Sequence, residues 1–114
     1  MKKFIKVMKA LSDPNRVKIV KLLGEKELCV CEITALLQIA QPTVSRHLKV
    51  LEDGGLVESW KDGSWVNYRI SPDEDSEYAG AMLVHLQEWL HDDKEFEALR
   101  FQLPEIDRAR ICAA

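Results

Sequence analysis

The sequence has little of several residue types, and each shortage excludes a class of protein. Only three of the 114 residues are cysteine, an odd number that is poorly suited to the disulfide framework of a small secreted domain. No apolar run approaches the ~18 residues that a membrane span needs. The lysines at positions 2 and 3 are not followed by the long apolar region of a secretion signal. We therefore expect a cytoplasmic chain with free thiols and no membrane partner.

The chain also lacks a strong net charge, but its charges are unevenly placed. Sixteen Lys and Arg oppose 19 Asp and Glu, which gives −3 in total. Residues 1–40 carry eight basic and four acidic side chains, whereas residues 71–114 carry four basic and eleven acidic ones. This asymmetry is typical of a single domain with one nucleic-acid face and one acidic flank.

Apolar spacing and turn signals predict a mostly α fold with a β-hairpin wing (α+β). Asp13 is a good helix N-cap, Pro14 suits the first helical position, and Asp62-Gly63 favours a tight hairpin. The predicted elements are helices over 2–11, 14–24, 30–38 and 42–53, strands over 56–60 and 65–70, a long helix over 73–92 and a short helix over 94–102. The order α-α-α-α-β-β-α predicts a dimeric winged helix-turn-helix; a generic α+β domain is the alternative. We assign residues 1–92 to the DNA-binding and dimerisation domain and 93–114 to a C-terminal short helix and tail.

Five segments then resemble a known family, the ArsR/SmtB repressors. They are ALSDPNR at 10–16, ELCVCE at 27–32, QPTVSRHL at 41–48, LEDGGLV at 51–57 and DGSWVNY at 62–68. Together they cover roughly residues 8–70, while residues 71–114 match only in being helical. The resemblance, which is to the arsenic-sensing type, implies a homodimeric repressor that leaves its operator when a toxic metal or metalloid binds.

The fourth predicted helix carries the candidate DNA-reading residues. Its polar side chains can reach base edges and phosphates in the major groove, and basic residues of the hairpin can contact phosphate. The predicted DNA contacts, on a double-stranded operator with an inverted repeat, are Gln41, Thr43, Ser45, Arg46, Lys49, Lys61 and Arg69. An ordinary solvated helix face is the alternative. We expect His47 to be packed or hydrogen-bonded rather than to touch a base.

Cys29 and Cys31 form the candidate inducer site, at the start of the third helix. A helix N-terminus lowers a thiol's pKa, and thiolate is a soft ligand that suits trivalent arsenic and antimony. Because two residues along a helix point about 200° apart, one atom can bind both sulfurs only if the first turn unwinds. Cys112 in the tail is a candidate third ligand, from the same or the partner subunit. The alternatives are inert structural cysteines and a tail cysteine without a role.

Other readings of the same residues stay open. Cadmium, lead or a thiol redox state could be sensed instead, and zinc could bind on the long helix through His85, Glu88, His91 and Asp92. A helical interaction module without DNA binding is a further alternative. A thiol oxidoreductase would need C-x-x-C, which is missing. Since no catalytic set or phosphate-cradling loop is evident, we predict a non-enzyme with no obligatory cofactor.

Two apolar stripes predict a symmetric dimer. They lie on the first and the long fifth helix at helical spacing, and they are larger than a small domain needs. Packing within one chain is the alternative for part of each stripe. The stripe residues are Phe4, Val7, Met8 and Leu11, followed by Tyr78, Met82, Leu86 and Trp89.

Overall fold

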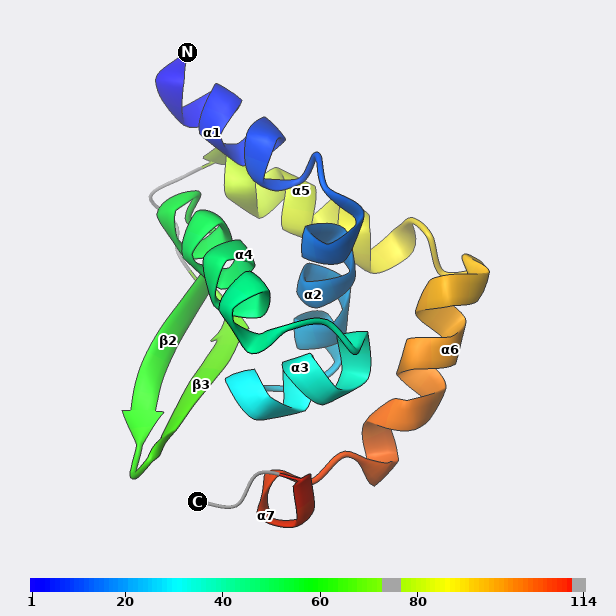
Figure 1. Cartoon of the computed structure of the whole chain (residues 1–114). Helices are drawn as coiled ribbons and strands as arrows, with labels where there is room; N and C mark the ends of the chain where they lie inside the picture. Colours follow the sequence, from blue (N-terminus) through cyan, green and yellow to red (C-terminus); the bar gives the residue numbers. More distant parts are fainter. Residues whose placement is uncertain (73–76, 112–114) are drawn as a thin grey trace.

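The computed structural model describes residues 1–72 and 77–111 (Figure 1). The described elements are, in chain order, α1 (Lys2–Ala10), α2 (Pro14–Glu25), β1 (Leu28–Cys29), α3 (Val30–Leu37), α4 (Gln41–Asp53), β2 (Val57–Asp62), β3 (Trp65–Ile70), α5 (Glu77–Glu88), α6 (Lys94–Gln102), the 3-10 turn η1 (Leu103–Glu105) and α7 (Arg108–Ile111). None of these helices is both long and apolar enough to cross a membrane.

Local sequence signals set the predicted helix boundaries. The Asp13 carboxylate caps α2 by accepting hydrogen bonds from the backbone N–H groups of Asn15 at 2.8 Å and Arg16 at 3.2 Å, as its N-cap position predicts. Between α3 and α4, α3 stops at Gln38, whose φ of 55° is left-handed. Gly63, with φ of 64°, makes the hairpin turn.

The core lies where α2, α3 and α4 meet. Their inward side chains are fully buried, and the predicted apolar face of α4, which carries Val44, Leu48 and Leu51, is 0% exposed. Ile19 and Leu22 of α2 pack into the same cluster. This packing holds α4 with its opposite face toward solvent.

The sheet has three antiparallel strands in the order β1-β3-β2. The hairpin β2–β3, which we call the wing, pairs from Val57↔Ile70 to Asp62↔Trp65 and confirms the predicted hairpin. The strand β1 was not predicted, because two residues carry no periodicity that a sequence pattern could reveal. It pairs Leu28 with Tyr68 and Cys29 with Asn67, so the segment before α3 joins the wing.

The C-terminal part departs from the prediction at both ends of α5. Residues 73–76 of the predicted helix lie outside the described residues, and α5 ends at Glu88 rather than at 92. It ends there because Leu90 adopts a left-handed φ of 63°. The Lys21 ammonium, which is 6% exposed, donates to the carbonyl oxygens of Leu86 and Trp89 at 2.6 Å each. These bonds anchor the end of α5 to α2.

The last described elements return toward the thiol segment, which is the stretch 28–32 that carries Cys29 and Cys31. The helix α6 has the predicted bounds. After η1, the chain forms α7 in the region predicted as a tail, and α7 packs against α3 (Figure 1). The division into 1–92 and 93–114 stays a prediction.

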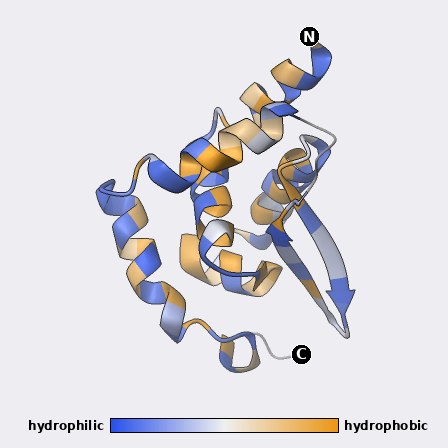
Figure 2. Cartoon of the chain, turned by 180° about the vertical axis from the view of Figure 1, so that it is seen from behind, coloured by the Kyte–Doolittle hydropathy of each residue, from blue (hydrophilic) through white to orange (hydrophobic). Residues whose placement is uncertain are grey.

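The apolar stripes of α1 and α5 are only partly available to a partner. Val7 is 1% exposed and Leu86 is 6% exposed, so these two side chains belong to the chain's own core and are removed from the predicted dimer surface. Phe4, Tyr78 and Trp89 are exposed, while Met8, Leu11 and Met82 are half-buried. Figure 2 shows hydrophobic segments along α5 on the rear of the molecule, with α1 beside it.

Candidate DNA interface and thiol site

The exposed face of α4 carries most of the predicted DNA contacts. Gln41, Ser45, Arg46 and Lys49 are exposed and Thr43 is half-buried, opposite the buried apolar face. The guanidinium of Arg46 donates to Thr43 Oγ1 at 3.3 Å, a neutral partner that leaves its charge uncompensated. Lys49 Nζ instead lies 3.1 Å from Asp53 Oδ1, and this carboxylate raises the pKa of Lys49 by hydrogen bonding. Of these two basic residues, Arg46 is therefore the one whose positive charge is not paired with a carboxylate in the described contacts.

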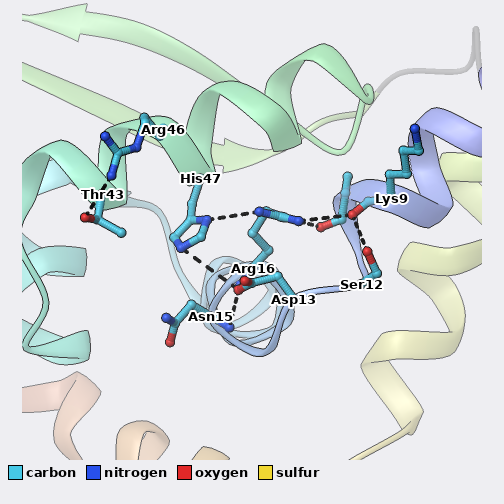
Figure 3. A network of polar contacts seen from close by, with 9 residues as sticks. Lys9, Ser12, Asp13, Asn15, Arg16, Thr43, Arg46 and His47 are labelled. Carbon is cyan, nitrogen blue, oxygen red and sulfur yellow. Dashed lines mark hydrogen bonds and ion pairs between the residues drawn. The ribbon is translucent and has the colours of Figure 1, made fainter.

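A polar network docks α4 against the start of α2 (Figure 3). Arg16 Nη1 lies 3.2 Å from His47 Nδ1, while its Nε and Nη2 donate to the carbonyl oxygens of Ala10 at 2.8 Å and Lys9 at 3.1 Å. Because a guanidinium can only donate, Nδ1 of His47 accepts and the ring proton lies on Nε2. That atom faces Asp13 Oδ1 at 3.9 Å.

This network confirms that His47 is packed and hydrogen-bonded. It also gives a structural role to Arg16, for which the sequence predicted none. Arg16 follows Pro14 at the start of α2 and donates to the last carbonyls of α1, a contact between two helices that no local pattern reveals.

The two basic wing residues differ in their surroundings. Lys61 is exposed on β2. Arg69 on β3 lies 2.5 Å from Glu58 and 3.8 Å from Glu27, and its guanidinium lies over the Trp60 ring at 4.8 Å. These two carboxylates partly compensate the charge of Arg69, so Lys61 is the better placed of the two for a phosphate contact.

Cys29 is at once a residue of β1 and the N-cap of α3. Its side chain is 1% exposed, and its backbone N–H donates to Glu32 Oε1 at 2.9 Å. The backbone N–H of Glu32 points back to the Cys29 sulfur, which completes a capping box. Cys31 is half-buried in the first turn of α3.

Burial changes the predicted acidity of the first thiol. Removal from water raises the pKa of Cys29 to about 11, against the hydrogen bond from the Glu32 backbone that lowers it, and the nearby Glu32 carboxylate adds to the rise. The prediction that the helix N-terminus would lower the thiol pKa is therefore wrong for Cys29, because desolvation of the charged form outweighs the helix terminus. At neutral pH this residue is a thiol.

The predicted third ligand, Cys112, lies outside the described residues. Within residues 1–72 and 77–111, no three His, Cys, Asp or Glu side chains form a group that could hold a metal ion. This includes the zinc alternative on α5, where the His85 ring stacks on Trp89 with centroids 4.6 Å apart. His91 follows the end of that helix.

The geometry of α3, α4 and the wing defines a winged helix-turn-helix, a class of DNA-binding proteins. HlyU from Vibrio cholerae has a similar solved structure, with 30% identity and a TM-score of 0.67 over 81% of this chain and 95% of that one. So does the homodimeric winged helix-turn-helix DNA-binding domain of a possible ArsR-family transcriptional regulator from Mycobacterium bovis, with 28% identity and a TM-score of 0.66 over 82% of both chains.

Sequence comparison identifies the family. Residues 13–59 match the family described as bacterial regulatory protein, arsR family. The arsenic resistance transcriptional regulator ArsR1 of Pseudomonas putida is 41% identical over 92 residues, which are 76% of this chain and 71% of that protein. The arsenical resistance operon repressor of Escherichia coli is 48% identical over 69 residues, 60% and 59% of the two chains. The chain belongs to the ArsR family of bacterial regulatory proteins, and is a transcriptional regulator rather than an enzyme.

Proposed function

We propose that the chain is a repressor that leaves its operator when trivalent arsenic or antimony binds Cys29 and Cys31. The observation that carries the proposal is the double placement of this segment, which starts α3 and also pairs with the wing strand β3. A ligand at this position acts on both parts of the DNA-binding unit. The names of the relatives in Pseudomonas putida and Escherichia coli, both arsenic or arsenical resistance regulators, support the same inducer class.

Binding of both sulfurs to one atom requires a change of backbone. Cys29 is the extended N-cap of α3 and its sulfur takes part in the capping box, whereas Cys31 lies in the helical first turn, so we expect the start of α3 to open when one atom takes both sulfurs. Opening it breaks the capping box between Cys29 and Glu32 and strains the Cys29↔Asn67 pairing. The wing is displaced directly, and α4 is displaced through its packing on α3.

The raised pKa of Cys29 favours arsenite over a divalent cation. Arsenous acid exchanges each hydroxide for a thiol and releases water, so the thiol proton leaves within that water and no proton goes to solvent. A cation such as Cd²⁺ must displace the proton into solvent. A thiol with a pKa of about 11 therefore opposes cadmium more than arsenite at neutral pH.

A third sulfur would raise affinity without being needed for the conformational step. Cys112 is our candidate, supplied by either subunit, and a small cytoplasmic thiol is the substitute. The two sulfurs of Cys29 and Cys31 already suffice to open the helix start. We place the protein in the cytoplasm, where such thiols are reduced.

On DNA, we propose a homodimer on an inverted repeat. The α4 face with Gln41, Thr43, Ser45, Arg46 and Lys49 enters the major groove, while Lys61 approaches phosphate, with Arg69 as a further candidate. The exposed side chains of α1 and α5 support a two-fold interface, as does the homodimeric state named for the Mycobacterium bovis domain. Its remaining candidates are Phe4, Met8, Leu11, Tyr78, Met82 and Trp89.

A release titration tests the inducer site. The purified reduced protein on its promoter DNA is titrated with As(III), Cd(II) and Zn(II), and fluorescence anisotropy records dissociation. We expect As(III) to release the wild type, and Cys29→Ser and Cys31→Ser to bind DNA normally but to resist release, because a hydroxyl is a much harder ligand than a thiol. Normal release of either variant by As(III) would overturn the proposal.

Arg46→Ala is the complementary control. It should weaken operator binding by roughly 1–3 kcal/mol if a base contact is lost, while As(III) binding, measured without DNA, stays intact. Unchanged operator affinity and salt dependence would remove Arg46 from the DNA face. An inducer effect of Cd(II) that rises steeply with pH would instead indicate a sensor of divalent cations.

A further inference from the structure

The short helix α7 packs against α3, and its first residue contacts the outer end of the wing. Its residue Arg108 touches both wing strands: Nη2 donates to Asp62 Oδ2 at 2.6 Å on β2, and Nη1 donates to Asn67 Oδ1 at 3.1 Å on β3. The guanidinium also lies over the Trp65 ring, 4.0 Å from its centroid. One side chain thus joins three wing residues that are more than forty positions away in sequence.

These contacts lie where the rest of the sheet stops supporting the wing. The strand β1 pairs only with Tyr68 and Asn67, so the outer pairs, Lys61↔Val66 and Asp62↔Trp65, form a two-stranded ribbon. A two-stranded ribbon alone is marginally stable in water. The contacts of Arg108 start where the pairing with β1 stops. They run from Asn67, the last residue paired with β1, to Asp62 at the turn.

The pairing with Asp62 also matters for charge. Asp62 lies beside the exposed Lys61 at the end of the wing, where a bare carboxylate would repel a phosphate. The hydrogen bond from Arg108 lowers the pKa of Asp62, so the carboxylate is ionised and compensated by the guanidinium.

We propose that Arg108 is a positioning residue for DNA binding, through which α7 braces the wing and compensates Asp62. The inference rests on the proposed contact between wing and phosphate, but not on the identity of the inducer. Because α7 packs on α3, the brace also joins the thiol segment to the wing by a route separate from β1.

The test measures operator affinity and wing mobility of the full chain without arsenic. We expect Arg108→Ala to weaken operator binding on the order of fivefold, within the range of such indirect couplings, and to speed amide exchange at residues 61–67 but not in α4. Arg108→Lys keeps the charge but loses the planar fork, so its loss should be intermediate. Adding Asp62→Asn to Arg108→Ala should restore part of the affinity.

Arg110→Ala is the matched control, since Arg110 is an exposed arginine on the same helix. It should leave affinity and amide exchange unchanged. Equal losses in both arginine variants would show a general charge effect and overturn the proposal. So would a loss in Arg108→Ala without faster exchange in the wing, which indicates a direct phosphate contact, or wild-type affinity in that variant. As(III) is absent throughout, so the effect of Arg108 on operator affinity can be interpreted even if the inducer proposal fails.

Discussion

Cys29 and Cys31 are two positions apart in the sequence but lie in different environments. Cys29 is 1% exposed, with its pKa raised to about 11 by burial, whereas Cys31 is half-buried on the first turn of α3. Only the thiolate attacks an alkylating reagent. The two thiols should therefore differ in reactivity, although their sequence context is nearly the same.

In a Cys112→Ser background at pH 7.5, iodoacetamide should modify Cys31 faster than Cys29, because burial covers the Cys29 side chain and raises the pKa of Cys29 to about 11. A raised pKa keeps Cys29 protonated, so its rate should continue to climb as the pH approaches 11. Peptide mass spectrometry at timed intervals measures both rates. Equal rates at pH 7.5 would contradict the burial of Cys29.

At the residue scale, the sequence predicts those properties that depend on residues nearby in the chain. The Asp13 cap follows from local position, and the place of His47 beside the apolar face of α4 predicts its packing, although its partner Arg16 lies 31 positions earlier. The acidity of Cys29 does not follow from local position, because it depends on burial by the folded chain, and even its strand partner Asn67 comes 38 positions later.

At the scale of elements, the position of α4 depends on the contacts that Arg16 makes. This side chain joins the end of α1, the start of α2 and His47 of α4. Arg16→Ala should lower the free energy of unfolding by about 1–3 kcal/mol, since it leaves partly buried acceptors unpaired, and should also weaken operator binding. Urea denaturation measures the first effect and anisotropy the second.

Arg100→Ala is the control for that variant. Arg100 pairs with Glu25 at the surface, 3.3 Å away, and such substitutions usually change stability by no more than about 0.5 kcal/mol. If the two variants were equally stable, the hydrogen bonds of Arg16 would contribute no more to the free energy of unfolding than an exposed ion pair does.

Elements with a repeating pattern were predictable and the shortest ones were not. The core helices and the wing have apolar faces and turn residues that identify them. In contrast, β1 has two residues and α7 has four, too few for a period, and they form because tertiary neighbours offer partners. The early end of α5 likewise depends on Leu90, whose left-handed φ is not typical of leucine.

At the scale of the whole molecule, the exposed apolar side chains of α1 and α5 predict the oligomeric state. Phe4 and Tyr78 are 40% and 37% exposed, and their rings meet edge to face with centroids 5.5 Å apart. Phe4→Asp should shift the protein toward monomer at micromolar concentration, because it places a charge in an apolar contact. Light scattering checks the mass.

Phe101→Asp provides the comparison, since Phe101 is 83% exposed on α6 and lies outside the proposed interface. It should leave the dimer intact. A wild type that scatters as a monomer at micromolar concentration would remove the dimer altogether.

The bonds of Lys21 have a consequence for the operator. Its ammonium ties the end of α5 to α2, and α2 contacts α4, so in the proposed dimer built on α5 these contacts restrict the movement of the two α4 helices about the two-fold axis. Each base pair inserted between half-sites turns one of them by roughly a tenth of a turn. A dimer restricted in this way would bind half-sites at one spacing and discriminate against a spacing one base pair longer. The number of base pairs between half-sites would then contribute to promoter selection.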